Sequence, residues 1–234
     1  MPFPAGSATA VSHAFVTNRH PARGSAGTHS RPVTAPAGQI RFAAMAWGAI
    51  ERGDSVYLRR PVAADRDEFT EAVRRSRALH RPWVEPPADR PAFDQYLARG
   101  RRRNKAHFLV CRNEDGVIVG VVNIDEIVRG HLQSAFLGYY AFAPFERHGY
   151  LREGLWLMLR HAFGPQALHR VEANVQPDNA ASIALVESLG FRREGYSPRY
   201  LKIGGRWRDH VRYSILAEEF RRAERQRHQP RSSR

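Results

Sequence analysis

Arg147, His148 and Gly149 stand directly before a stretch of the chain whose apolar residues have helical spacing. A glycine at the start of a helix lets the first peptide N–H groups turn outward, and these groups have no partner within the helix. They lie at the positive end of the helix dipole, so together with the two basic side chains they suit a diphosphate. A single glycine can also simply cap a helix, so this loop needs support from other residues.

The loop must be positioned by a strand on one side and a helix on the other. The run 133–142 is rich in apolar and aromatic residues and is typical of a strand. After Gly149, a four-residue spacing of apolar side chains predicts a helix over 150–163, namely Leu151, Leu155, Leu159 and Phe163. Gly164 and Pro165 end it.

The rest of the chain alternates between strand and helix patterns. The expected strands are 56–59, 107–111, 117–124, 133–142, 169–175, 200–203 and 207–216, and the expected helices are one starting at 65–68, then 90–97, 150–163 and 179–189. The sum is a single α+β domain over 50–217. We expect a mixed, mostly antiparallel sheet of about six to seven strands flanked by about four helices.

Two flanking segments differ from this pattern. Residues 1–44 are rich in Ala, Pro, Gly, Ser and Thr without a sustained period, which predicts a disordered extension. Met45 follows it and is a candidate for the true start of the protein. Residues 218–234 are polar and charged and are expected to form a charged C-terminal tail.

The composition excludes several classes of protein. One cysteine among 234 residues rules out an internal disulfide and a cysteine-rich zinc site, and it favours a reducing, cytoplasmic compartment. The histidines show no metal-ligand spacing, so no metal is expected. No apolar run approaches the roughly 18 residues that cross a bilayer, and hydrolase-elbow, zinc-protease and P-loop signatures are absent.

The formal net charge of +14 has two interpretations. All but two of the 37 basic residues are arginines, the exceptions being Lys105 and Lys202. Much of the excess lies in the two flanking segments, so an arginine-biased solvated surface accounts for it. The alternative is a weak contact with RNA or a ribosome through the basic surface.

Beyond composition, the stretch Phe145–Leu151 resembles motif A of the GCN5-related N-acetyltransferases (GNAT). Further stretches in the same order are similar to the RimJ/RimL branch of that family, namely 79–86, 128–130, 137–139, 174–182, 189–191, 194–196 and 200–211. The resemblance covers about 56–217 and implies the GNAT fold. It departs from the family pattern at Glu146, where Gln or Arg is usual, and at Leu151, where a small residue is usual.

This resemblance implies an enzyme that uses acetyl-coenzyme A as co-substrate and acetylates a protein N-terminal α-amine. In the RimJ type the acceptor is the N-terminal alanine of a small-subunit ribosomal protein, reached by direct transfer in a ternary complex. The coenzyme would lie against backbone groups of Ala141, Phe142, Ala143, Arg147, His148, Gly149, Tyr150 and Leu151, with Asn179 and Ser182 near its sulfur. Ser182 would protonate the departing thiolate, and Trp83 and Tyr139 would border the substrate cleft.

A strong base is unnecessary, because an α-amino group has an ordinary pKa of about 7.7–8.0. A carboxylate acting through a water is enough, and Glu126 and Glu85 are the candidates. A solvated surface carboxylate is an equally good interpretation of each. Two alternative functions stay open: acetylation of a small-molecule amine, and a non-catalytic acetyl-coenzyme A-binding module that associates with the ribosome.

Overall fold

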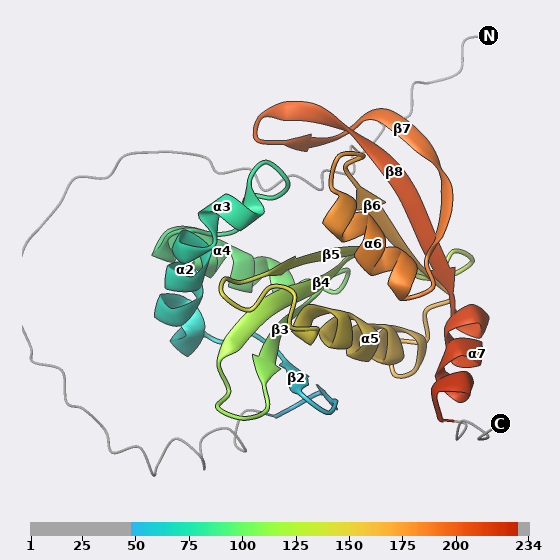
Figure 1. Ribbon diagram of the computed structural model, residues 1–234, viewed down its shortest axis with the longest axis horizontal. Coiled ribbons are helices and arrows are strands. Elements are labelled where there is room, and N and C mark those ends of the chain that lie inside the picture. The colour runs from blue at the N-terminus through green and yellow to red at the C-terminus, as the bar shows by residue number, and fades with distance from the viewer. Residues whose placement is uncertain (1–47, 229–234) are drawn as a thin grey trace, which may run out of the picture.

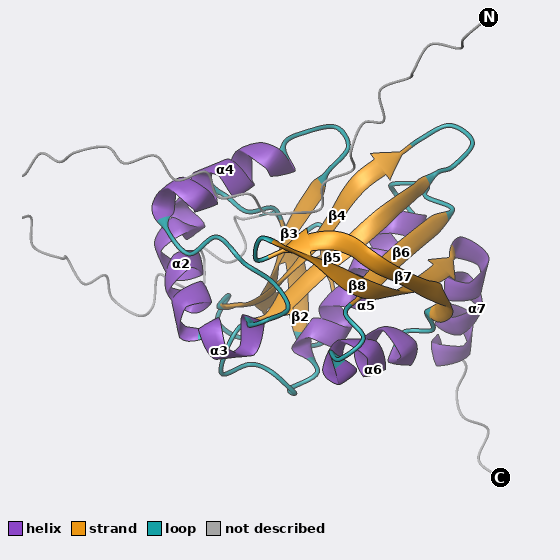
Figure 2. Ribbon diagram, turned by 90° about the horizontal axis from the view of Figure 1, so that it is seen from above, coloured by secondary structure: helices purple, strands orange, loops and turns teal. Residues whose placement is uncertain are grey.

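The protein forms one eight-stranded sheet in the order β1-β2-β3-β4-β5-β6-β8-β7, with helices on both faces (Figures 1 and 2). The computed structural model describes residues 48–228. In chain order its elements are β1 (Glu51–Arg52), β2 (Val56–Arg59), the 3-10 helix η1 (Ala63–Asp65), α2 (Arg66–Arg75), α3 (Arg77–His80), α4 (Arg90–Gly100), β3 (Ala106–Arg112), β4 (Ile118–Val128), β5 (Ser134–Ala141), α5 (Tyr150–Phe163), β6 (Arg170–Val175), α6 (Ala180–Ser188), β7 (Arg192–Ile203), β8 (Arg206–Leu216) and α7 (Ala217–His228). The predicted α+β class is therefore confirmed.

The pairing of β5 with β6 is parallel, whereas every other neighbouring pair in the sheet is antiparallel. The parallel ladder begins at Ser134 opposite Arg170 and ends at Leu137 opposite Ala173. On its other side, β5 stays paired with β4 as far as Ala141. Residues 138–141 therefore have a strand neighbour on one side only, which opens the middle of the sheet.

Alternation along the strands gives the sheet two apolar faces. On β4, Val122 packs with Leu155 of α5 in one cluster of buried residues. Its neighbour Val121 packs with Phe69 of α2 and Phe93 of α4 in the other cluster. Figures 1 and 2 show α2, α3 and α4 grouped on one side of the molecule, with α6 and α7 on the other. The sheet thus separates the α2–α4 face from the α5–α6 face.

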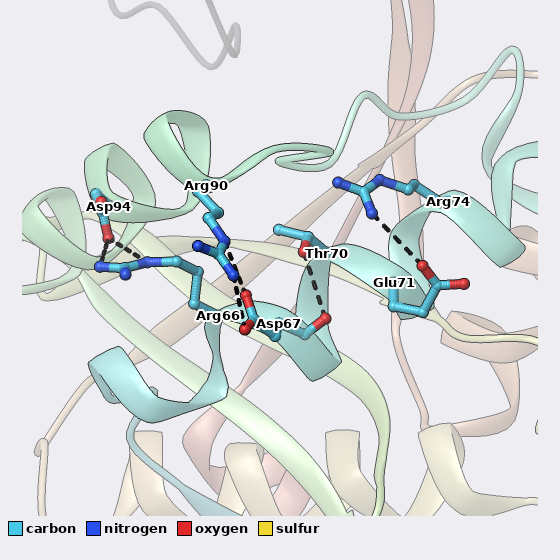
Figure 3. Close-up of polar contacts among 7 residues, drawn as sticks. All are labelled: Arg66, Asp67, Thr70, Glu71, Arg74, Arg90 and Asp94. Carbon is cyan, nitrogen blue, oxygen red and sulfur yellow. Dashed lines mark hydrogen bonds and ion pairs between the residues drawn. The ribbon is translucent and has the colours of Figure 1, made fainter. Parts of the chain in front are cut away.

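Helices α2 and α4 are also joined at their exposed sides by ion pairs (Figure 3). The Arg66 guanidinium donates to Asp94 at 2.7 Å, and Arg90 donates to Asp67 at 2.9 Å. Within α2, the Thr70 hydroxyl donates to the Asp67 carbonyl. Each exposed pair stabilises the fold by about 1 kcal/mol at most, so the buried phenylalanines dominate this contact.

The structure extends the expected elements at the C-terminal end. Strand β7 runs from Arg192 to Ile203 instead of over 200–203 alone, and with β8 it forms a long twisted hairpin (Figure 1). Residues 217–228 form α7, whose Phe220 is buried against Trp156 and Phe163. The folded region therefore continues beyond the expected boundary at 217. The predicted extension 1–44, Met45 and the tail end 229–234 lie outside the described residues.

Candidate active site

Helix α5 begins where the sequence predicted, and its first turn is open. Gly149 is the residue before the helix and has a φ of +83°, a left-handed conformation that favours glycine. A Cβ built on Gly149 meets nothing within 4 Å. The first helical hydrogen bond runs from the Glu153 N–H to the Gly149 carbonyl, so the amides of 150–152 have no helical acceptor. These outward amides at a helix N-terminus suit an anion.

The side chains beside this turn leave the amides uncovered. His148 donates through Nδ1 to the Glu146 carbonyl at 2.8 Å and stacks on the Tyr150 ring. Arg147 is exposed, in a left-handed conformation with a φ of +64°. Glu153, the acid of the first turn, accepts from the Ser55 N–H and so is directed away from the amides. The local charge around the open turn therefore comes from basic groups.

Glu146 is the exception in this loop. Its Oε2 is buried and has no hydrogen-bond partner among the described residues. It forms no ion pair with Arg147, and Arg152 instead donates to the Ser188 carbonyl and hydroxyl. One carboxylate oxygen next to Arg147 in the chain is thus buried without a hydrogen-bond partner among the described residues.

Most hydrogen-bonding groups in the backbone of 141–143 already have partners within the fold. We expected these peptide groups to pair with the coenzyme's pantetheine arm, but the fold already uses five of the six. The Phe142 carbonyl accepts from the Phe145 N–H, and the Ala143 carbonyl accepts from Arg75 Nε at 3.0 Å. The Ala141 carbonyl accepts from His80 Nε2 at 2.8 Å, and the Ala143 N–H donates to the Ser76 hydroxyl at 2.8 Å. The Phe142 N–H donates to the Val119 carbonyl. The available edge of β5 therefore lies earlier, at 138–141, where β6 has separated.

Alternation in the antiparallel ladder decides which groups face that edge. Because Phe142 bonds to Val119 on β4, the peptide groups of Tyr139 and Ala141 point away from β4. They face the gap between β5 and β6, with the Ala141 carbonyl already occupied. An extended ligand segment could pair with this edge as a partial strand.

Tyr139 and Ser182 meet beside the same gap. The two hydroxyls are 2.5 Å apart, one from β5 and the other from the first turn of α6. Asn179 caps α6 by accepting from the Ser182 N–H at 3.1 Å, which fixes the position of the serine. Burial raises the pKa of Tyr139 although the hydrogen bond from Ser182 lowers it, so the phenol stays protonated.

One cavity of about 330 Å³ connects these groups with residues from distant parts of the chain. Six of the predicted site residues line it: Trp83, Glu85, Glu126, Tyr139, Asn179 and Ser182. The loop 147–151 and the segment 141–143 lie outside its lining. The fold thus separates the predicted residues into a cavity group and a helix-terminus group.

The two candidate bases have different surroundings. Glu126 accepts from Lys105 Nζ at 3.0 Å and from the Asn104 amide at 3.1 Å, so its charge is already compensated. Glu85 is exposed and forms no ion pair among residues 48–228. Lys105 also reaches Asp125 at 2.8 Å. Both glutamates were predicted as candidate bases, and both line the cavity, but the pairing of Glu126 with Lys105 was not foreseen.

Asp125 is a cavity residue that the sequence analysis missed. Its burial raises the pKa of the carboxyl group, but the hydrogen bond and charge of His107, together with Lys105, bring the pKa down to about 2. His107 in turn stacks on Tyr96 with the ring centroids 4.5 Å apart. Strict alternation would point the neighbouring side chains of Asp125 and Glu126 to opposite faces of the sheet. Both contact Lys105 where the β4–β5 ladder shifts register and Glu126 has a φ of +50°, so the strand pattern gave no signal for this cluster.

Residues 48–228 hold no cluster of three or more His, Cys, Asp or Glu side chains that could bind a metal ion. None of the helices in that range combines the length and the apolar character that crossing a membrane requires.

Comparison with known proteins agrees with this geometry. The model of the acetyltransferase (GNAT) domain matches residues 55–192. The probable N-acetyltransferase YjcK of Bacillus subtilis is 35% identical over 127 residues, which cover 54% of this chain and 70% of that protein. The ribosomal protein uS5-alanine N-acetyltransferase of Escherichia coli is 40% identical over 103 residues, 44% of this chain and only about half, 53%, of that enzyme.

Among solved structures, Mycobacterium smegmatis RimJ in complex with CoA-disulfide superimposes with a TM-score of 0.65 at 31% identity. The superposition covers 70% of this chain and 83% of that one. The matched family region ends at 192, so most of the β7–β8 hairpin lies beyond it.

Proposed function

This chain belongs to the acetyltransferase (GNAT) domain family, and we propose that it acetylates the N-terminal α-amine of a protein, with acetyl-coenzyme A as donor. The acceptor we propose is the N-terminal alanine of a small-subunit ribosomal protein. The E. coli relative with this specificity in its name is 40% identical over the matched region, and the superimposed M. smegmatis protein is a RimJ. An N-acetyltransferase activity is common to the names of the relatives.

The observation that carries the proposal is the single cavity that joins the Ser182 hydroxyl, the free edge of β5 and the carboxylate of Glu85. Acetyl transfer to an amine needs a proton donor for the leaving sulfur, a guide for the donor's extended arm and an acceptor for the amine's proton. All three types of group lie around this cavity.

The residues at the start of α5 fit the diphosphate of coenzyme A. The amides of 150–152 are free, the space over Gly149 is open, and Arg147 and His148 add donors beside it. Acetyl-coenzyme A, when bound, supplies a thioester whose acyl group can pass to a nitrogen nucleophile. The edge at Tyr139 and Ala141 would guide its arm into the cavity.

The chain's own groups then account for the proton movements. The acceptor amine, in its neutral form, attacks the acyl carbon as the carbon–sulfur bond breaks. Ser182 donates its proton to the departing sulfur and is reprotonated by the Tyr139 hydroxyl that it contacts, and Tyr139 regains a proton from solvent in the cavity. Glu85, which forms no ion pair among residues 48–228, takes the amine's proton through a water and releases it to solvent. Trp83 forms part of the wall that orients the acceptor.

The transfer is direct, in a ternary complex. The single cysteine, Cys111, is fully buried, and burial raises the pKa of its thiol to about 12. Such a thiol is neither accessible nor ionised, so it is a poor acyl carrier. This supports transfer without a covalent acyl-enzyme.

We also propose a weak contact with ribosomal RNA, which the positive charge of the β7–β8 hairpin supports. Arg193, Arg199 and Arg206 are exposed on the β7–β8 hairpin, and no ion pair of theirs forms within residues 48–228. Phosphate contacts of this kind weaken steeply as salt rises, so a binding titration at several salt concentrations tests the contact.

The decisive experiment supplies the purified protein with acetyl-coenzyme A and a panel of acceptors. The panel contains hexapeptides with the free N-terminal sequences of small-subunit ribosomal proteins, the same peptides with a blocked N-terminus, and spermidine. We expect the free alanine peptides to be acetylated far more efficiently, by kcat/KM, than the blocked peptides or a simple amine such as spermidine. Acetylation of spermidine without peptide acetylation would establish the small-molecule alternative, and coenzyme binding without turnover would establish the non-catalytic one.

A further inference from the structure

Gly138 lies inside β5, opposite Asn123 of β4, at a position where the fold has no need of a glycine. Its backbone is not in the left-handed region. A Cβ built on Gly138 meets only the Asn123 Cβ, at 4.0 Å. By contrast, a Cβ at Gly154 would meet the Val110 side chain at 2.8 Å, so packing explains that glycine.

A glycine inside a strand weakens the strand, because it gives up backbone entropy and packs no side chain. Such a residue often marks a place where a ligand approaches the backbone closely. Gly138 lines the cavity that contains Ser182, so the open space above it belongs to the active site.

Tyr140, two residues along β5, faces the same side of the sheet. It is only 6% exposed, and its ring packs against His80 and Phe142. It lines the same cavity, yet its hydroxyl has no hydrogen-bond partner among the described residues. A buried polar group without a partner is costly, so this hydroxyl needs an explanation.

The partner of that hydroxyl must accept a hydrogen bond. Burial raises the pKa of Tyr140, although the charge of Arg99 lowers it, so the phenol keeps its proton. An ammonium group could donate to the phenol oxygen, but it has no lone pair to accept from the O–H. A carbonyl oxygen can accept this hydrogen bond. In a peptide the first carbonyl oxygen is two bonds from the carbon that bears the α-amine.

We propose that Gly138 and Tyr140 form the seat of the acceptor's first residue. The open space over Gly138 receives that residue, and the Tyr140 hydroxyl donates to its carbonyl oxygen. This inference rests on the proposed function and deepens it, because the seat selects peptides over simple amines. Asn123 closes the far wall, with its Oδ1 fixed by the Tyr96 hydroxyl at 2.9 Å.

The test of Gly138 is a substitution that fills the space. Gly138→Val should raise the KM for an alanine hexapeptide at least about tenfold, while the Kd for coenzyme A by calorimetry stays within about twofold. Gly195→Val is the matched control, because Gly195 also lies in a strand without a left-handed backbone and with open space around a built Cβ. It lies outside the cavity lining, so its KM should equal that of the wild type.

The test of Tyr140 removes the hydroxyl and keeps the ring. Tyr140→Phe should raise the peptide KM up to about tenfold, the effect of one lost hydrogen bond. The KM for isopropylamine, which has no carbonyl, should not change. Circular dichroism and thermal unfolding establish that both variants are folded.

The possible failures are distinguishable. An unchanged peptide KM in folded Gly138→Val overturns the seat, and an equal loss for peptide and isopropylamine in Tyr140→Phe overturns the carbonyl contact. If the wild type acetylates spermidine and no peptide, the proposed function fails and the role of Tyr140 falls with it. The spermidine KM of Gly138→Val then still decides whether acceptors sit over Gly138.

Discussion

The hydroxyl of Ser182, at the start of α6, lies 2.5 Å from the hydroxyl of Tyr139, near the end of β5. The two residues are 43 positions apart in the chain. They meet because β5 and β6 separate after Leu137, which lets the first turn of α6 approach the strand. This contact makes a pair of groups that can pass a proton to a leaving thiolate and replace it.

Ser182→Ala should lower kcat about a hundredfold, since the proton donor to the sulfur is lost. Tyr139→Phe should lower it less, because Ser182 remains and water can replace the phenol. The double variant should be no slower than Ser182→Ala alone, since the two groups act as one unit. Thiol release under saturating substrates measures all three.

Ser188→Ala is the control for this pair, because Ser188 lies on the same helix and its hydroxyl donates to the Leu185 carbonyl within it. Its kcat should match that of the wild type. Fully multiplicative losses in the double variant would show that Ser182 and Tyr139 act independently.

Gly149→Asp should weaken coenzyme A binding at least about a hundredfold, because a carboxylate would stand close to the diphosphate. The substitution also strains the backbone, since φ is +83° there. Gly130→Asp controls for that strain, because Gly130 has a φ of +70° and open surroundings but lies in the β4–β5 loop. Calorimetry that finds equal affinities for the two variants would contradict the assigned diphosphate site.

Glu85→Gln should lower kcat/KM for the peptide about tenfold or more at neutral pH, because Glu85 is the cavity carboxylate without a paired cation. Glu126→Gln should lower kcat/KM less than Glu85→Gln does. It should lower the free energy of unfolding more, since Glu126 accepts hydrogen bonds from Lys105 and Asn104. Steady-state kinetics and urea unfolding on both variants separate the two effects. A larger loss of kcat/KM in Glu126→Gln than in Glu85→Gln would contradict this assignment and make Glu126 the base.

Asp65→Asn should lower the free energy of unfolding by about 3 kcal/mol, because it removes the carboxylate that compensates the buried Arg59 guanidinium. In the wild type, Arg59 donates two hydrogen bonds to Asp65, and both side chains are less than a tenth exposed. The exposed pair between Arg66 and Asp94 is the comparison, and Asp94→Asn should cost less than about 1 kcal/mol. Urea unfolding curves with equal midpoints for the two variants would refute this assignment.

Asp125 should make the fold sensitive to acid. Its pKa is about 2 in the folded protein, below the ordinary 3.8, so its ion pairs stabilise the fold above about pH 4. That contribution, about 2 kcal/mol, is lost as the pH falls from about 4 to 2. In Asp125→Asn the free energy of unfolding should be lower at pH 5 and should fall less steeply below pH 4. Glu194, whose pKa is also about 2, titrates equally in both proteins and does not disturb the difference.

The order of strands and helices was predictable because each depends on nearby residues. The helical spacing from Leu151 to Phe163 and the glycine before it are local features, and the structure starts α5 at Tyr150. The strand 133–142 was likewise predicted, and β5 covers Ser134–Ala141. What local patterns could not give was the length of β7, an exposed strand without clear alternation that depends on its pairing with β8.

The sequence by itself determined the open helix start at Gly149, the α+β class and the family, since these depend on short-range spacing and ordered motifs. Tertiary structure alone decided that Tyr139 meets Ser182, whereas the hydroxyl of the adjacent Tyr140 is buried without a partner among the described residues. It also decided that the Ala143 N–H is taken by Ser76, 67 positions away, and that Lys105 holds Glu126. The physical reason is that a hydrogen bond between distant residues forms only where packing brings its two atoms together, and no local period encodes that distance.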